Sequence, residues 1–126
     1  MGMYTGLRGS ITFKQSVAQV LQEVGFDWQV IAYHTQSEAA KAFANKGRSG
    51  FIPRGALCYM PSDWDSIVDE WIDETTYSFA CSLKNYDGEI EAFLQTLPDI
   101  ADYWELEELY EESESAIIHS DTKEKL

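Results

Sequence analysis

Two clusters of acidic side chains are the residues whose spacing has the clearest chemical consequence. The first cluster consists of Asp63, Asp65, Asp69, Glu70, Asp73 and Glu74, and the second of Glu105, Glu107, Glu108, Glu111, Glu112 and Glu114. In a β-strand, residues i and i+2 point the same way at intervals of about 6.6 Å, which is near twice the ~3.4 Å rise per phosphate along one DNA strand. Glu105 and Glu107, continuing to Glu111, are therefore predicted to present a phosphate-like row of carboxylates. The alternative is a solvated acidic face that only keeps the protein soluble.

Two tryptophans lie inside the first acidic cluster. Trp64 and Trp71 are anchors of a partner interface if their rings are exposed, and ordinary core residues if they are not. Core burial is the favoured alternative, because four Trp and seven Tyr must help to fill one small core. Together with the two acidic clusters, these tryptophans make up the predicted partner-binding surface.

The charges are sorted along the chain. Residues 1–61 carry three acids and six bases, whereas residues 62–126 carry nineteen acids and three bases, so that the halves have formal charges of +3 and −16 and the chain a net charge of −13. So negative a chain repels nucleic acid and anionic membranes, and it attracts proteins whose working surface is basic. We therefore expect a basic protein partner, and no direct binding to nucleic acid or to a membrane.

Basic side chains gather in the first half as a counterpart to the acids. They are Arg8, Lys14, Lys41, Lys46, Arg48 and Arg54. Because the net charge opposes RNA binding, we predict that this basic patch balances the acidic half within the fold or across a homodimer contact.

Patterns typical of metal sites and of catalysis are weak. Residues 63–67 begin an acidic loop, but the sequence does not continue to the glycine and distal glutamate of an EF-hand. His34 and His119 lack the spacing of HExxH or HxH sites, and no GxSxG or P-loop sequence occurs. Cys58 and Cys81 are far from a CxxC pair and are predicted to be small buried hydrophobes. We therefore predict neither an enzyme nor a cofactor.

Length and composition predict a single domain over residues 1–126. A chain of this length with 44% apolar residues can fill one core, and the polar tail over about 121–126 is expected to fray. No stretch approaches the roughly 20 apolar residues that span a bilayer, and the first residues lack the features of a signal peptide. A soluble, cytoplasmic protein is expected.

The first half must supply a strand and two or three helices to position these side chains. Residues 6–13 predict an opening strand, and the apolar repeat over 17–24 predicts a helix that ends at Gly25. Residues 26–33 fit either a strand or a short helix capped by Asp27. The strong helix formers over 37–47 predict a further helix, capped by Ser37.

The acidic half predicts mainly strands. Residues 56–60 form a short apolar run typical of a buried strand. Residues 62–76 fit either a helix or a hairpin that turns at 73–76, and we favour the hairpin. The alternation over 77–83 predicts a strand with one buried face.

A helix and a closing hairpin are predicted to follow. The apolar stripe over 90–97 predicts a helix with Asp87 as its N-cap and Pro98 as its end. The closing hairpin is predicted over 103–110 and 115–120. Its inward side chains are predicted to be Trp104, Leu106 and Ile117.

These elements indicate an α+β domain. Its sheet is antiparallel or mixed and carries two to three helices. The strand–helix–strand unit over 77–110 is predicted to be ferredoxin-like, with its helix covering one face of the sheet.

Three stretches of the chain resemble a group of small proteins encoded by bacteriophages and mobile elements. The stretches are Tyr4-Thr5-Gly6-Leu7-Arg8, the run Phe51-Ile52-Pro53 with Gly55, Leu57 and Tyr59-Met60-Pro61, and Phe79 with Cys81-Ser82-Leu83-Lys84-Asn85-Tyr86. The resemblance reaches to about residue 98 and implies a phage or mobile-element origin, with no activity or catalytic residue to carry over. By analogy, small acidic proteins of such origin include inhibitors of host defence and anti-CRISPR proteins that imitate nucleic acid.

Two functions follow as hypotheses. In the first, the acidic half occupies the basic nucleic-acid site of a host defence factor, such as a CRISPR effector complex, and inhibits it by competition. In the second, the chain is a self-associating structural or assembly module with a merely solvated acidic face.

Overall fold

The computed structural model describes residues 4–46, 52–53, 64, 69–84, 88–110 and 116–119. The strand predicted over 56–60 and the tail predicted over 121–126 lie outside these ranges. Of the first acidic cluster, residues 69–74 are described.

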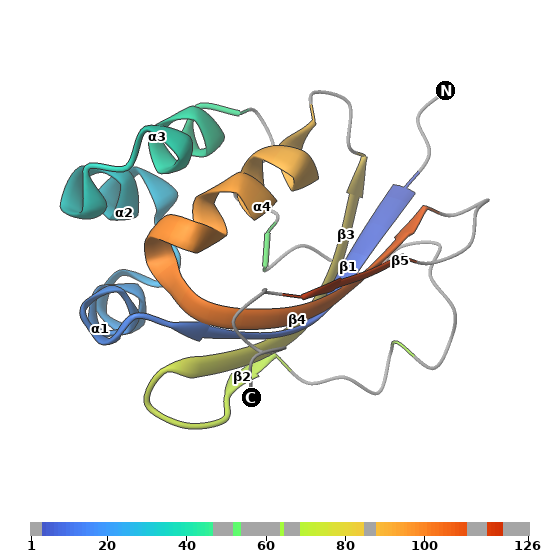
Figure 1. Cartoon of the computed structure of the whole chain (residues 1–126), viewed down its shortest axis with the longest axis horizontal. Helices are drawn as coiled ribbons and strands as arrows, with labels where there is room; N and C mark the ends of the chain where they lie inside the picture. The colour runs from blue at the N-terminus through green and yellow to red at the C-terminus, as the bar shows by residue number, and fades with distance from the viewer. Residues whose placement is uncertain are drawn as a thin grey trace.

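A five-stranded antiparallel sheet forms the base of the molecule, in the order β2-β3-β1-β4-β5 (Figure 1). The central strand β1 (Tyr4–Phe13) lies between β3 (Thr76–Lys84) and β4 (Ala101–Tyr110). Short strands follow on either side, β2 (Glu70–Trp71) next to β3 and β5 (Ala116–His119) next to β4. The predicted opening strand, the strand over 77–83 and the pairing of the closing hairpin are confirmed. The hairpin predicted over 62–76 is confirmed for its described part, residues 69–76.

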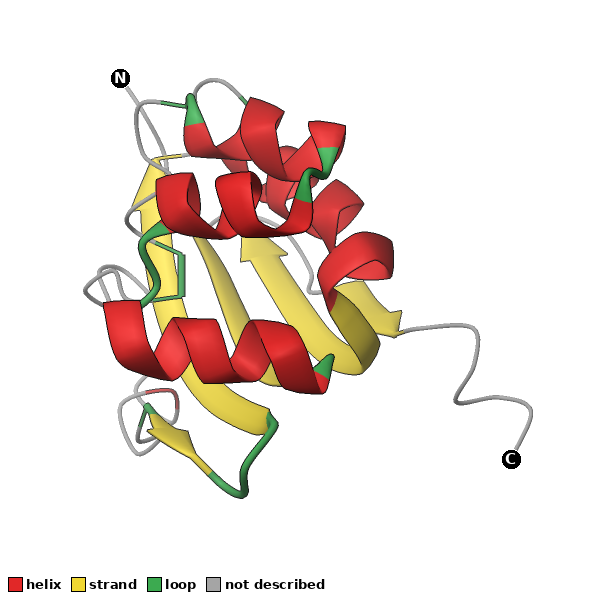
Figure 2. Cartoon of the chain, turned by 90° about the vertical axis from the view of Figure 1, so that its left-hand side faces the viewer, coloured by secondary structure: helices red, strands yellow, loops and turns green. Residues whose placement is uncertain are grey.

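Helices cover one face of this sheet (Figure 2). They are α1 (Gln15–Val24), α2 (Trp28–Thr35), α3 (Glu38–Ala44) and α4 (Glu89–Ile100). The α+β class is confirmed, but these four helices exceed the two to three that the sequence predicts. Within the described residues, no helix is both long and apolar enough to cross a membrane.

The extra helix is α2, in the segment for which the sequence fits two structures. Gly25 ends α1 in the left-handed conformation, with a φ of 69°. The Asp27 carboxylate then accepts hydrogen bonds from the backbone N–H groups of Gln29 and Val30, which is the geometry of an N-cap. The cap and the burial of Trp28 therefore favour a helix here over a strand.

The core lies between the helices and the sheet. Strand β1 contributes Leu7, Ile11 and Phe13, which are buried against the helix layer. Aromatic rings fill the space above the strands, among them Phe26, Trp28, Phe43 and Phe93 in tilted or edge-to-face contacts. The buried Trp28 indole donates a hydrogen bond of 2.7 Å to the carbonyl of Ile52.

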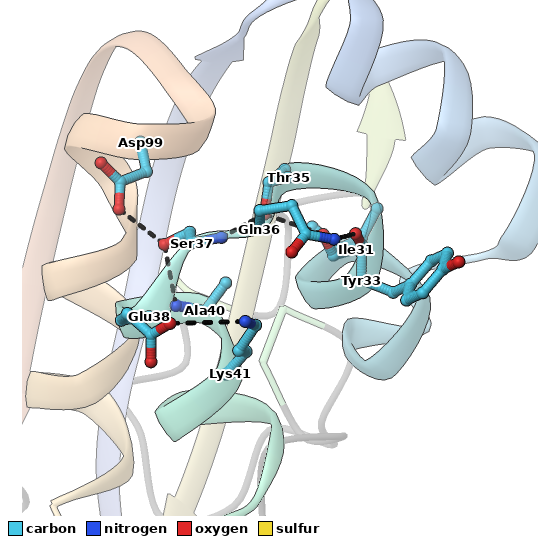
Figure 3. A network of polar contacts seen from close by, with 9 residues as sticks. All are labelled: Ile31, Tyr33, Thr35, Gln36, Ser37, Glu38, Ala40, Lys41 and Asp99. Carbon is cyan, nitrogen blue, oxygen red and sulfur yellow. Dashed lines mark hydrogen bonds and ion pairs between the residues drawn. The ribbon is translucent and has the colours of Figure 1, made fainter.

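A polar network joins the turn between α2 and α3 to the last turn of α4 (Figure 3). Ser37 Oγ accepts from the backbone N–H of Ala40 at 3.1 Å and donates to Asp99 Oδ2 at 2.6 Å. Thr35 Oγ1 donates to the Ile31 carbonyl and accepts from the N–H of Ser37. The predicted cap of α3 thus also fixes this helix against α4.

Strands β3 and β4 are joined by α4 and have β1 between them. Both pair antiparallel with β1, so they run parallel to each other. This is a split β–α–β unit, which ferredoxin-like folds also contain. The ferredoxin-like detail of the fold stays a prediction.

Three details of the predicted second half are wrong: the end of α4, its N-cap and the direction of Ile117. Pro98 does not end α4: the helix continues to Ile100, with the N–H of Ala101 bonded to the Leu97 carbonyl. Ile117 does not point inward, because it pairs with Glu107 on the side away from the helices, whereas Ile118 packs against the core.

The predicted N-cap residue Asp87 lies outside the described residues, and Gly88 occupies the cap position with a φ of 71°. Leu106 is buried and Trp104 packs against the core, as predicted.

Candidate functional site

The face of the sheet opposite α1, α2, α3 and α4, called here the helix-free face, presents the side chains that alternate with the core residues. In β1, Arg8 and Ser10 lie on this face because Leu7 and Ile11 point into the core. Residues paired directly across neighbouring antiparallel strands share a face. The register of the sheet therefore specifies which side chains meet Arg8 and Ser10.

One row of this face has two hydroxyls between two carboxylates and ends at a histidine. Across β2, β3, β1 and β4 the paired residues are Glu70, Ser78, Ser10 and Glu105, and Glu105 pairs in turn with His119 on β5. Both glutamates are exposed, and both serines are half-buried. From β2 to β4 the row thus presents oxygen-bearing side chains, and two of them are carboxylates.

The adjacent row contains an ion pair between the two halves of the chain. Its residues are Ala80, Arg8, Glu107 and Ile117, on β3, β1, β4 and β5. Arg8 Nη2 and Nε both lie 2.7 Å from Glu107 Oε1. The Arg8 guanidinium also lies over the Trp64 ring, 4.5 Å from its centroid, which is a cation–π contact. Arg8 is therefore held from two sides.

A hollow of about 460 Å³ lies over these two rows. Its lining residues are Arg8, Gly9, Ser10, Ile72, Ser78, Glu105, Leu106, Glu107 and Ile117. Ile72 and Ile117 have 61% and 66% of their surface exposed. The hollow thus combines carboxylates, hydroxyls and exposed aliphatic groups, a composition typical of a binding surface.

Gly9 lets β1 and β4 approach each other beneath this hollow. Its φ is 138°, and a Cβ atom added to it would lie 2.1 Å from the carbonyl oxygen of Glu105. Only glycine fits such a position without moving one of the two backbones. The placement of Glu105 relative to Ser10 therefore depends on this residue.

The second acidic cluster is divided between the two faces of the sheet. Glu105 and Glu107 share the helix-free face, as the i, i+2 spacing predicts, although the charge of Glu107 is compensated by Arg8. Glu108 points to the helix side, where burial first, and then the negative charge of Glu91, raise the pKa of its carboxyl. Three further members, Glu111, Glu112 and Glu114, lie outside the described residues.

Two acids of the first cluster stabilise the β2–β3 hairpin. Asp69 Oδ1 accepts the backbone N–H of Ala80 at 3.1 Å. Asp73 Oδ1 accepts the N–H groups of Thr75 and Thr76 at 2.9 and 2.8 Å, and these two bonds lower the pKa of Asp73.

The remaining acids of this cluster are placed differently. Glu70 and Glu74 are exposed, and Glu70 belongs to the carboxylate row described above. Asp63 and Asp65 lie outside the described residues.

Of the two tryptophans of the predicted surface, Trp64 is buried and Trp71 is half-buried. Trp64 is only 1% exposed. Trp71 is half-buried and packs against Phe13, Phe26 and Tyr77. Their burial favours the core alternative, and Trp64 contributes to the site indirectly, through its contact with Arg8.

The residues considered for catalysis are not brought together. His34 lies exposed on α2, His119 lies on β5, and Cys81 is fully buried in β3. Cys58 lies outside the described residues. In the part of the chain that the structure describes, no group of three or more His, Cys, Asp or Glu residues is arranged to hold a metal ion.

Ser10, Ser78, Ile72 and Ile117 are the site residues that sequence reasoning missed. For Ser10, Ser78 and Ile117 the only signal is the strand alternation that places them on the face away from the core, and Ile72 lies in the turn after β2, where no such alternation applies. Which strand lies beside which depends on contacts distant in sequence, so this signal does not reveal the hollow.

The whole chain has no match among known proteins by sequence or by structure. No protein-family model matches it, and neither a curated protein nor a solved structure shows significant similarity. The resemblance to phage-encoded proteins stays a prediction.

Proposed function

We propose that this protein acts as an acidic inhibitor that binds the basic nucleic-acid site of another protein and competes with the nucleic acid. The observation that carries the proposal is the cross-strand row that contains the exposed Glu70 and Glu105, on the face of the sheet opposite α1, α2, α3 and α4, in a chain with a net charge of −13. A groove built of Lys and Arg side chains meets such a face with favourable long-range electrostatics.

The phosphate-like row of carboxylates predicted along β4 enters this proposal with one change, which concerns Glu107. Glu105 is exposed, and Glu107 forms an ion pair with Arg8. In the described part of the chain, the carboxylates that would imitate phosphates are therefore Glu70 and Glu105, which lie across the sheet. Glu105 and Glu107 along β4 contribute less as a pair. The sequence resemblance extends the proposal to a phage origin and to a host defence factor, such as a CRISPR effector, as the target.

A pull-down tests the proposal. The tagged protein is used at low salt to capture partners from a bacterial lysate, and the salt concentration is then raised in steps, with mass spectrometry of each fraction. We expect one nucleic-acid-binding protein or complex, released by salt, because charged contacts are screened as ionic strength rises. A variant with Glu70, Glu74 and Glu105 changed to Gln should capture less of it. Equal capture by that variant contradicts the proposal.

Self-association is the second candidate. The exposed Ile117 on β5, the last strand in the order of the sheet, favours it, since an exposed aliphatic residue on such a strand promotes pairing with another copy. The ion pair between Arg8 and Glu107 weakens it, because these opposite charges of the two halves are compensated within one chain. Light scattering at low and at high salt distinguishes the candidates: a salt-sensitive oligomer without a partner favours assembly.

A further inference from the structure

We propose that the outer edge of β5 pairs with an extended, basic segment of the partner, which adds a further strand to the sheet. This inference rests on the proposed function and names the contact by which the partner is held. β5 is the last strand in the order β2-β3-β1-β4-β5, and within the described residues it pairs on one side only, with β4. The backbone N–H and C=O groups along such an edge can form a ladder with another chain.

The strand β5 lacks the devices that commonly protect the edge of a sheet. Charged side chains, proline and β-bulges are the usual ones. β5 has the sequence Ala-Ile-Ile-His, and its residues pair one to one with residues 105–108 of β4. An added strand therefore meets a regular edge without Asp, Glu, Lys, Arg or Pro.

The opposite edge of the sheet is blunted. β2 comprises only two residues, Glu70 and Trp71, and the first of them is charged. Next to β2, the backbone N–H of Ala80 on β3 donates a hydrogen bond of 3.1 Å to the Asp69 carboxylate. Of the two edge strands, β5 thus offers the longer run of backbone for pairing.

The exposed Ile117 favours an aliphatic or β-branched neighbour on the added strand. Ile117 is 66% exposed on the helix-free face, whereas Ile118 packs against the core. Side chains of an added strand alternate between the two faces, so that every second one lies on the side of Ile117. A cross-strand contact with such a side chain would cover Ile117.

The charge of this region selects a basic segment rather than a second copy of the chain. Residues 62–126, which include β5, carry nineteen acids and three bases, a formal charge of −16. Three of the four β4 residues in register with β5 are glutamates, and Arg8 compensates one of them. Two copies joined at β5 would bring two such regions together and repel each other, whereas lysine and arginine side chains are attracted. The attraction needs only the negative sign of the region, and no carboxylate left without a contact.

A lysine-flanked decapeptide serves as the probe for the full chain. It has alternating threonine and valine between two lysines at each end, and every second backbone nitrogen is methylated, so that only one edge of the peptide can form a ladder. Hydrogen exchange and amide chemical shifts are followed by NMR while the peptide is added at low salt. We expect the largest shifts in residues 116–119 and exchange about tenfold slower at the β5 amides that point outward, because a ladder protects them. Binding should weaken as the salt concentration rises.

Two control peptides separate the ladder from charge alone. In the first, the remaining backbone nitrogens of the central segment are methylated as well, which keeps the charges and the side chains but blocks both edges. In the second, glutamates replace the lysines. We expect neither peptide to bind β5. Binding of either control as tightly as the probe would overturn the proposal.

Ile117→Thr and Ile72→Thr are matched variants of the protein. Ile72 is exposed to a similar extent, 61%, and borders the same hollow, but it lies in the turn after β2. Ile117→Thr should weaken peptide binding about threefold, the effect expected for one cross-strand contact, while Ile72→Thr should leave it unchanged. Equal losses would place the peptide in the hollow rather than on the edge, and would contradict the proposal.

Failure of this inference can be distinguished from failure of the proposed function. If the peptide leaves β5 unprotected while the protein still displaces nucleic acid from its captured partner, the inference is wrong and the function stands. The inference is also wrong if the β5 amides become protected as the concentration of the protein alone is raised, because a second copy then occupies the edge. If the peptide pairs with β5 while the captured partner keeps its nucleic acid, the inhibitory function is wrong.

Discussion

Arg8 and Glu107 face each other at one register position of β1 and β4, and their side chains form an ion pair 2.7 Å long between the basic and the acidic halves of the chain. The two residues are 99 positions apart in sequence. This ion pair holds both side chains at the edge of the hollow next to Glu105. The charge of the helix-free face therefore depends on it, because the pair compensates one carboxylate.

A double-mutant cycle measures the coupling of this pair. The variants are Arg8→Met, Glu107→Gln and the combination, and the free energy of unfolding is obtained from urea titrations. We expect a coupling of about 0.5–1 kcal/mol, because both side chains are only partly buried and water screens their attraction. Additive effects of the two substitutions would show that the ion pair does not stabilise the fold.

Gly9→Ala should destabilise the protein strongly. The new Cβ would lie 2.1 Å from the Glu105 carbonyl oxygen, and the φ of 138° is unfavourable for alanine. We expect a loss of about 3 kcal/mol in the free energy of unfolding. Gly88→Ala is the matched control: its φ is also positive, but among the described residues its Cβ would meet only the Glu91 side chain, at 3.4 Å, so we expect a loss of about 1 kcal/mol. Similar losses for both variants would contradict the close approach of β1 and β4.

Glu108→Gln should raise stability at pH 7. Burial and the charge of Glu91 raise the pKa of Glu108 in the folded state, so the folded protein favours the protonated carboxyl. The stability gained from protonation is present below the pKa of the unfolded chain and is lost as pH rises through the folded pKa. The urea midpoint of the variant should therefore exceed that of the wild type at pH 7 and approach it at acidic pH. A midpoint that is lower at pH 7 would contradict this assignment.

Asp73→Ala should destabilise the β2–β3 hairpin. Its carboxylate accepts the backbone N–H groups of Thr75 and Thr76, which lowers its pKa. Its contribution is therefore present above the unfolded pKa and is lost as pH falls through the folded pKa. Glu74→Ala removes the same charge from the neighbouring exposed position. Hydrogen exchange at Thr76 and the urea midpoint should change more for Asp73→Ala at pH 7, and this difference should shrink at acidic pH.

Local signals predict much of the fold. The alternation over 77–83 fixes the buried face of β3, and the Ser37 cap fixes the start of α3. The segment around Trp28 is undecided in the sequence because its apolar residues fit both periods, and the Asp27 cap and aromatic packing settle it. Pro98 fails as a stop signal because α4 runs directly into β4, with the backbone bond from Ala101 to Leu97 closing the last turn.

The candidate site is less predictable. The i, i+2 spacing of Glu105 and Glu107 predicts that they share a face, and they do. Their neighbours Ser10 and Ser78 come from strands far away in the sequence, so they are specified by sheet order and register rather than by any local pattern. Arg8 is also specified by sheet order and register. Its ion pair compensates Glu107 and so changes the charge that Glu105 and Glu107 would present along β4.

Competition with nucleic acid is the most direct test of the central claim. A labelled nucleic acid is bound to the purified partner from the pull-down, and this protein is added at several salt concentrations while fluorescence anisotropy is recorded. The account predicts that the label is displaced, that displacement weakens as salt rises, and that the variant with Glu70, Glu74 and Glu105 changed to Gln displaces much less. Simultaneous binding of the protein and the nucleic acid to the partner would contradict it.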